Sequence, residues 1–254
     1  MFLDDSPLPT CACSPKPVVP ETRAVSDCPL CLGSGRADAV STAPCRCVTA
    51  ERDAAAAWAA DVLADPGIAV LDCETTGLVG SYAVEITALD ADGAVLLDTL
   101  VNPQIPIPAD ATAVHGLTDA DVAAAPTFSQ ILPQLEHALA GRRLVIYHAA
   151  FDTGVLSREL DRHHRALHPS ETAPSCGSEW HLHCHHVRTA TWWQRVRQID
   201  CAMQQYAAFN GEWNPDKGRF ARVRLDGGHR ARGDCEAVLA RLATMAAHLQ
   251  PERV

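Results

Sequence analysis

The chain has 254 residues, of which 47% are hydrophobic and 20% are charged, and its formal net charge is -10. These values are typical of a globular protein with a sizeable core. No apolar run approaches the roughly 20 residues that span a bilayer, and residues 1–5 lack the basic start of a signal peptide, so we expect a cytoplasmic protein without a membrane segment.

The charge is unevenly distributed along the chain. Residues 1–140 carry 5 Lys and Arg against 19 Asp and Glu, whereas residues 141–254 carry 16 against 12. A basic C-terminal part is suited to a phosphate backbone, and an acidic part is suited to cations. A solvated surface with uneven charge is the alternative interpretation.

Cysteine is concentrated near the N-terminus, where six of the eleven cysteines precede residue 48. Residues 1–50 are also rich in Pro and poor in periodic apolar residues, which predicts a small loop-dominated module that needs cross-links to fold. In a reducing compartment, clustered cysteines indicate a metal before a disulfide.

The cysteine spacing predicts a structural zinc site. Cys28-x-x-Cys31 is followed by glycine, which is typical of a knuckle, and two more thiolates follow at Cys45 and Cys47. The pattern resembles one half of a DnaJ-type cysteine-rich repeat, from which the Cys45-x-Cys47 spacing departs. Free cysteines or a redox pair are the alternatives, and Cys11-x-Cys13 is an alternative pair or a separate ion site.

The apolar patterns that follow predict alternating strands and helices. An Ala-rich stretch at residues 51–65 is typical of a linking helix, which Pro66 and Gly67 end. Strands are expected at 68–73, 84–89, 95–101, 144–147 and 198–200, and helices at 128–139, 151–167, 201–209 and 231–249. A strand hairpin followed by strands that alternate with helices implies an α/β fold over residues 66–254, with a mixed sheet flanked by helices.

Residues 168–191 have no clean period and are expected to form an insertion. Histidine and cysteine gather there, at Cys176, His181, His183, Cys184, His185 and His186. These side chains suit Zn²⁺, but their crowding gives no unique ligand set, and a polar loop is the alternative. The tryptophans at 192, 193 and 213 are expected to be core or loop anchors, with base stacking as the alternative role.

Asp72 and Glu74 stand at the end of the first predicted strand of the sheet. Because side chains alternate across a strand, the two carboxylates share a face. They repel each other, and a divalent cation relieves that repulsion. Mg²⁺ and Mn²⁺ both accept carboxylate oxygens. An ordinary strand-end pair that faces water is the alternative.

Further acidic positions stand where helices begin. Asp152 follows a buried strand at a helix start, where capping is an alternative role. His229 and Asp234 precede the last helix, and their separation of five suits one site if His229 lies in the loop and Asp234 in the first helical turn. An imidazole that titrates near neutrality is suited to take a proton from water, and an exposed loop histidine is the alternative.

Together these motifs resemble the DnaQ-like DEDDh exonuclease family. The resemblance rests on Asp72-Cys73-Glu74-Thr75-Thr76-Gly77, His148-Ala149-Ala150-Phe151-Asp152 and residues 229–234, is extended by Val114-His115-Gly116-Leu117-Thr118 and residues 125–128, and covers about residues 66–250. It implies an RNase H-like fold, two bound Mg²⁺ or Mn²⁺ ions and hydrolysis from a 3' end.

The resemblance also assigns roles. It implies that the metals are held by Asp72, Glu74, Asp152 and Asp234, and that His229 is the general base. Contacts to the terminal nucleotide are expected from Thr75, Leu78 and Phe151. The chain departs from the family pattern at His148, where many relatives have Asn, and at Cys201, where Thr is common. The first departure bears on substrate positioning.

We therefore expect a 3'-5' exonuclease that releases nucleoside monophosphates from single-stranded or 3'-ended DNA, in repair or end trimming. The catalytic residues do not read the sugar, so RNA trimming stays open. A zinc-bearing interaction module on an inactive nuclease fold is the alternative from another class, and the intact set of five residues argues against it. Because every carboxylate follows residue 71, hydrolysis is expected to be independent of residues 1–50.

Overall fold

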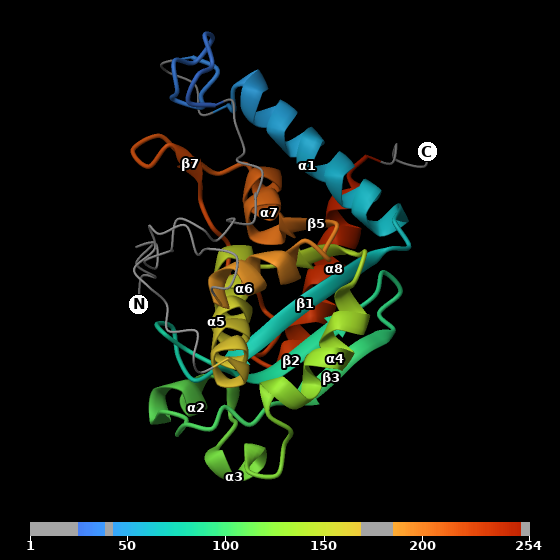
Figure 1. Ribbon diagram of the computed structural model, residues 1–254. Coiled ribbons are helices and arrows are strands. Elements are labelled where there is room, and N and C mark those ends of the chain that lie inside the picture. The colour runs from blue at the N-terminus through green and yellow to red at the C-terminus, as the bar shows by residue number, and fades with distance from the viewer. Residues whose placement is uncertain (1–24, 39–42, 169–184, 250–254) are drawn as a thin grey trace, which may run out of the picture.

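One mixed sheet organises the protein. The computed structural model describes residues 25–38, 43–168 and 185–249, with the side chains of residues 185–187 excepted. Its five-stranded sheet has the order β3-β2-β1-β4-β5. Helices α4 (Phe128–Leu139) and α5 (Ala149–Leu167) cover one face of the sheet, and α8 (Ala231–Ala247) covers the other (Figure 1). This is the expected RNase H-like α/β architecture, and among the described helices none has the length and apolarity needed to cross a membrane.

The strands lie close to their predicted positions. They are β1 (Ile68–Thr75), β2 (Ala83–Leu89), β3 (Val95–Leu100), β4 (Arg143–Ile146) and β5 (Gln198–Cys201). β1 pairs antiparallel with β2 and parallel with β4. β2 is buried along its whole length because both faces of the sheet are covered. The β1–β2 register places Glu74 opposite Glu85, and a bulge follows at Glu74/Thr75.

The long helices were also predicted, and their apolar stripes explain their positions. In α4, Phe128, Ile131, Leu135 and Leu139 are buried at helical spacing. A capping box between Thr127 and Gln130 fixes its start. Helix α7 (Ala202–Asn210) follows β5 directly and ends at Gly211, whose φ of 76° suits a glycine C-cap.

Helix α1 begins earlier than the sequence predicted. It spans Arg46–Ala64, so the expected boundary at residue 50 falls inside one continuous helix. Val48 is buried in the same core as Ala55 and Ala59, and this tertiary packing extends the helix beyond its Ala-rich part. α1 lies against α8 and α7.

Several short elements were not predicted. They are α2 (Ala109–His115), α3 (Asp119–Val122), α6 (His185–Trp193) and the hairpin of β6 (Trp213–Asn214) and β7 (Arg219–Phe220). α6 occupies part of the stretch that was expected to be irregular. It forms there because Trp192 and Trp193 are buried, and α6 packs on α5. Both tryptophans are therefore core anchors.

Candidate metal-dependent active site

Three carboxylates from two elements meet near the carboxyl end of the central strand β1. Asp72 and Glu74 alternate with Cys73 on β1 and so share a face, as predicted. Asp234 enters from the first turn of α8. One ligand oxygen from each of the three lies within 4.8 Å of the others. Such a set matches the oxygen ligands that Mg²⁺ and Mn²⁺ take.

Asp152 lies beside this group without belonging to the 4.8 Å set. It stands in the first turn of α5 and is buried. Its Oδ1 accepts a hydrogen bond of 3.1 Å from the backbone N–H of Cys73, the residue between Asp72 and Glu74. This bond ties the start of α5 to the middle of the carboxylate pair on β1.

The carboxylates are costly to ionise together without a cation. Burial, followed by the charges of Asp152 and Asp234, raises the pKa of Asp72 well above its ordinary value. Burial likewise raises the pKa of Glu74 to about 7, with Asp234 and Glu85 adding to the effect. The pKa of Asp152 rises to about 8, and that of Asp234 also rises, in both cases chiefly through burial.

This electrostatic arrangement predicts how metal-free stability depends on pH. Since the pKa values of Glu74 and Asp152 rise in the folded state, that state binds protons that the unfolded chain, with carboxyl pKa values near about 4, has released. The stabilisation is present in acid and is lost as the pH rises through about 7 and about 8. Urea unfolding of the metal-free protein should show falling stability from acid to weakly alkaline pH.

Saturating Mn²⁺ should remove most of that fall, because the cation compensates the ionised carboxylates. The Asp72→Asn variant should show a flatter metal-free profile than the native chain. Stability that rises with pH in the metal-free protein would contradict this electrostatic account.

The loop before α8 wraps around Asp234. His229 has a positive φ of 57° and an exposed side chain, and its backbone N–H bonds to the Asp234 carboxylate, which lowers the pKa of that group. Gly227 lies so close to Asp234 that a Cβ on this glycine would overlap the carboxylate Oδ1. Gly228 has a φ of 88°, which favours glycine. The loop thus positions His229 and Asp234 together.

This packing predicts a large effect for one methyl group. In Gly227→Ala, the new Cβ should displace the Asp234 carboxylate, and a displacement of about 1 Å is expected to lower turnover by about 100-fold. Titration with Mn²⁺ should show weaker binding, while circular dichroism shows a folded protein. Native Mn²⁺ affinity and native turnover in this variant would show that the close approach has no role.

An ion pair, which the sequence did not suggest, anchors the same loop. Glu85 on β2 is buried and accepts hydrogen bonds from Arg230 Nε at 3.0 Å, from Arg230 Nη2 at 2.5 Å and from the backbone N–H of Ala231 at 2.9 Å. Glu85 raises the pKa of Arg230 in turn. The signal in the sequence is a lone carboxylate within a buried strand, where a paired partner is required.

His115 is another site residue without an assigned role. Its buried ring lies between the N–H of Leu117, 3.1 Å from Nδ1, and the carbonyl of Thr75, 3.1 Å from Nε2. Nδ1 is therefore the acceptor and Nε2 carries the proton. Burial lowers the pKa of His115, which favours this neutral form. The side chain fixes the end of β1 directly after Glu74.

The residues expected to contact a nucleotide differ in how far their side chains are exposed. Leu78 is 60% exposed, Thr75 is buried, and Phe151 is half-buried and stacked on His148 with ring centroids 6.1 Å apart. Thr75 Oγ1 donates to the carbonyl of Gly77 at 2.7 Å, so it is engaged in the turn. Leu78 therefore presents its side chain to solvent beside the site.

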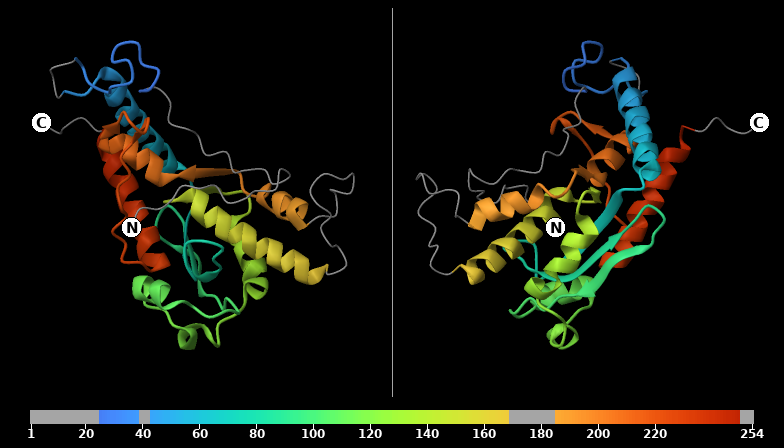
Figure 2. Two further views of the ribbon diagram at one scale, coloured as in Figure 1. Left: turned by 90° about the vertical axis from the view of Figure 1, so that its left-hand side faces the viewer. Right: turned by 45° about the vertical axis from the view of Figure 1, so that its right-hand side comes forward.

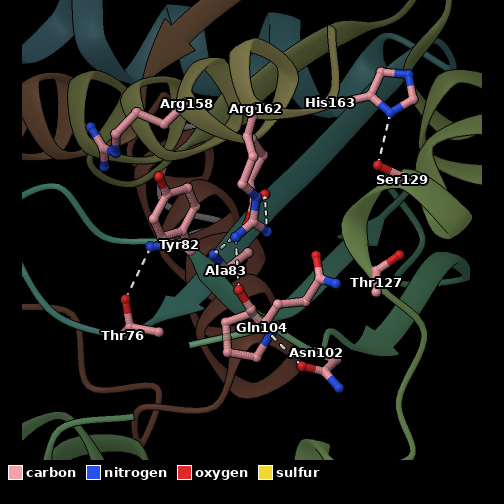
Figure 3. Close-up of polar contacts among 12 residues, drawn as sticks. Thr76, Tyr82, Ala83, Asn102, Gln104, Thr127, Ser129, Arg158, Arg162 and His163 are labelled. Atoms are coloured by element: carbon pink, nitrogen blue, oxygen red, sulfur yellow. Dashed lines mark hydrogen bonds and ion pairs between the residues drawn. The ribbon is translucent and has the colours of Figure 1, made fainter. Parts of the chain in front are cut away.

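The loop that carries Leu78 is anchored at its far end to α5 (Figure 3). The backbone N–H of Tyr82 donates to Thr76 Oγ1 at 3.1 Å, and that of Ala83 donates to Glu159 at 3.1 Å. Arg162 pairs with Glu159 at 2.7 Å and lies 4.2 Å from the centre of the Tyr82 ring. These contacts hold residues 76–83 against the same helix that supplies Asp152.

The four predicted cysteines form a separate cluster. Ligand atoms of Cys28, Cys31, Cys45 and Cys47 all lie within 4.8 Å of one another, and all four thiols are free. Cys73, Cys201 and Cys235 are buried elsewhere as free thiols. Outside the described residues lie Cys11, Cys13, Cys176, His181, His183 and Cys184. His185 and His186 are in α6, but their side chains lie outside the described part as well.

An RNase H-like sheet that brings three carboxylates together from β1 and α8 offers the oxygen ligands that a metal-dependent hydrolase of phosphate esters needs. The sequence model of the exonuclease family (RNase_T) matches residues 69–242. The chain belongs to this exonuclease family and is a hydrolytic nuclease of the DnaQ-like group.

Individual relatives agree with this assignment. An uncharacterised exonuclease, CP81, of Escherichia phage 186 is 33% identical over 189 residues, which cover 69% of this chain and 86% of the phage protein. DNA polymerase III subunit epsilon of Pasteurella multocida is 32% identical over 104 residues, which cover 37% of this chain and 41% of that subunit. Escherichia coli exonuclease I, solved with a dA16 oligonucleotide, shares the fold with a TM-score of 0.51 at 15% identity, over 72% of this chain and 41% of that one.

Proposed function

We propose that this protein is a 3'-5' exonuclease that hydrolyses DNA and releases nucleoside monophosphates, in DNA repair or end trimming. The observation that carries the proposal is the meeting of Asp72, Glu74 and Asp234 within 4.8 Å, with Asp152 bonded between them and His229 bonded to Asp234. The similarity to a polymerase III epsilon subunit and to an exonuclease solved with DNA supports DNA as the substrate.

The carboxylate set fits two Mg²⁺ or Mn²⁺ ions, held by Asp72, Glu74, Asp152 and Asp234. The fit rests on acidic side chains whose pKa values are raised chiefly by burial, with neighbouring carboxylates adding to the effect. When bound, such ions activate water and stabilise the charge that develops on phosphate and leaving oxygen. The four thiols form a different ligand set, which suits one structural Zn²⁺.

His229 takes the proton from the attacking water. Its side chain is exposed at the mouth of the site, and the backbone bond to Asp234 together with the glycines at 227 and 228 keeps it beside the ligands. An imidazole nitrogen is a proton acceptor suited to this role. The ion pair between Glu85 on β2 and Arg230 holds the loop that carries His229 against the sheet.

The remaining residues seat the terminal nucleotide. Leu78 and Phe151 supply apolar surface for a base, from the loop after β1 and from α5. Thr75 lies at the turn between them, where its bond to Gly77 shapes the loop. Base stacking and apolar contacts of this kind do not depend on sequence.

Polarity and substrate are tested on four matched strands: linear single-stranded DNA, the same DNA with a blocked 3' end, a closed circle, and the equivalent RNA. With Mn²⁺, we expect digestion of the linear DNA and protection of the blocked and circular forms. Circle cleavage at a similar rate would refute exonuclease polarity. Faster digestion of RNA would replace the DNA assignment with RNA trimming, and inactivity on every strand would favour an interaction module.

A further inference from the structure

The geometry of the cysteine cluster is that of a closed zinc site. The sulfurs of Cys28 and Cys45 are 4.0 Å apart, and those of Cys31 and Cys47 are 3.7 Å apart. Sulfurs bound to tetrahedral zinc at about 2.3 Å lie about 3.8 Å from each other, whereas a disulfide bond is about 2.05 Å long. Four thiols at the zinc spacing leave no open coordination position, which is the mark of a structural site.

The backbone around the cluster forms a knuckle. The N–H groups of Cys31 and Leu30 point at the sulfur of Cys28, and the N–H of Cys45 donates to the carbonyl of Gly35 at 2.8 Å. Within this loop, Leu30 and Leu32 are 70% and 86% exposed, so the loop between Cys28 and Gly33 adds little apolar side chain to the core. A loop with so little core depends on its metal for stability.

The knuckle contacts a hairpin far away in the sequence. Trp213 Nε1 donates to the carbonyl of Gly33 at 2.9 Å, and a Cβ on Gly35 would lie 2.7 Å from the Trp213 ring. Trp213 also packs edge-on against the buried Phe220, with ring centroids 5.1 Å apart. The views in Figure 2 show the knuckle, in blue, beside the hairpin, in orange. The knuckle therefore contacts Trp213 on β6, and Trp213 in turn packs on Phe220 of β7.

Exposed cations extend from the hairpin toward the active site. Lys217 and Arg219 belong to the hairpin, and Arg222 and Arg224 follow it; all four are exposed. This segment is anchored next to the catalytic edge, because the hydroxyl of Tyr147, one residue before His148, donates to the carbonyl of Val223. The same segment then continues into the loop that carries His229.

We propose that a zinc ion held by Cys28, Cys31, Cys45 and Cys47 supports the 213–220 hairpin, and that this hairpin is a secondary contact for the substrate. The cations of the hairpin hold the phosphate backbone of the substrate several nucleotides from the cleaved bond. The inference rests on the proposed nuclease function. The occupant follows from charge complementarity with phosphate and from continuity with the site. The contact of Tyr147 with Val223 lies between the hairpin and His229 along the chain. Because the hairpin contact is away from the cleaved bond, loss of the hairpin affects long strands more than short ones.

The zinc assignment is tested by elemental analysis of the purified full chain. One zinc per chain is expected for the native protein and for Cys11→Ser/Cys13→Ser. Less than a tenth of that zinc content is expected for Cys28→Ser/Cys31→Ser, because the loss of two thiolates destroys a four-ligand site. Full zinc content in Cys28→Ser/Cys31→Ser would overturn the site. Loss of zinc in Cys11→Ser/Cys13→Ser alone would assign the ion to the other pair and also overturn it.

The hairpin contact is tested by anisotropy with labelled single-stranded DNA in an Asp72→Asn background, which measures binding without hydrolysis. Lys217→Ala/Arg219→Ala should weaken binding of a long strand about tenfold and lower the salt slope by about 1.4. The Trp213→Ala variant should keep its zinc and should bind the long strand more weakly than the native hairpin does. It should bind a trinucleotide with unchanged affinity. The matched control is Arg195→Ala/Arg197→Ala, which removes two exposed charges before β5, at the opposite end of the parallel strands.

Equal weakening by the control pair would reduce the effect to net charge and overturn the hairpin contact. Unchanged long-strand binding in Lys217→Ala/Arg219→Ala, or in Trp213→Ala, would overturn it too. Because these are binding measurements, they hold or fail separately from hydrolysis: a native chain that binds DNA through the hairpin but does not cut it would refute only the nuclease proposal.

Discussion

Replacing Asp72 by Asn is expected to lower turnover at least about 1000-fold while the fold is kept, because the variant loses a metal ligand and with it the charge that stabilises the transition state. The amide is nearly the same size as the carboxylate, so no cavity opens. The change also removes one charge from a cluster in which burial and like charges raise the pKa of Asp72 itself. Metal-free stability should therefore stay equal or increase.

The matched control is Asp92→Asn, an exposed carboxylate in the β2–β3 turn. It should keep native turnover and native Mn²⁺ affinity. Steady-state rates with Mn²⁺ and a thermal melt of each protein decide the point. Near-native turnover in Asp72→Asn would remove this residue from the catalytic set, and an unfolded Asp72→Asn protein would show that its role is structural.

His229→Gln is expected to lower turnover at neutral pH by about 100- to 10,000-fold, the range that a positioned general base contributes. Binding of Mn²⁺ should be nearly unchanged, because the carboxylate ligands and the backbone bond from residue 229 to Asp234 remain. Steady-state rates with saturating Mn²⁺ at neutral pH measure this loss.

His137→Gln serves as the control, since His137 is an exposed histidine in the last turn of α4. It should match the native protein in rate. The base assignment fails if His229→Gln retains near-native turnover, because another group would then be accepting the proton. A variant that loses Mn²⁺ binding as well would place His229 among the residues that shape the metal site.

Local patterns were sufficient for the sheet and for most of the acidic cluster. The alternation of Asp72 and Glu74 along a strand needs only the period of two, and Asp152 stands at the helix start that the apolar pattern predicted. Asp234 likewise lies in the first turn of its helix. These positions follow from residues that are near each other in the sequence.

The contacts that depend on tertiary register could not be predicted in this way. Glu85 meets Arg230 across 145 residues, and Gly33 meets Trp213 across 180 residues. Helix α6 likewise forms because it packs on α5, although its own sequence has no clear period. Such pairings are fixed by the β1–β2 register and by helix packing, which no local pattern encodes.

The most direct measurement of the central claim is a time course with a single DNA strand labelled on its 3'-terminal nucleotide. With Mn²⁺ present, the carboxylate site predicts that the first labelled product is a mononucleotide, and that a chelator stops its release until Mn²⁺ is restored. Release of the label within a longer fragment, or undiminished release in the presence of chelator, would contradict a metal-dependent 3'-5' exonuclease.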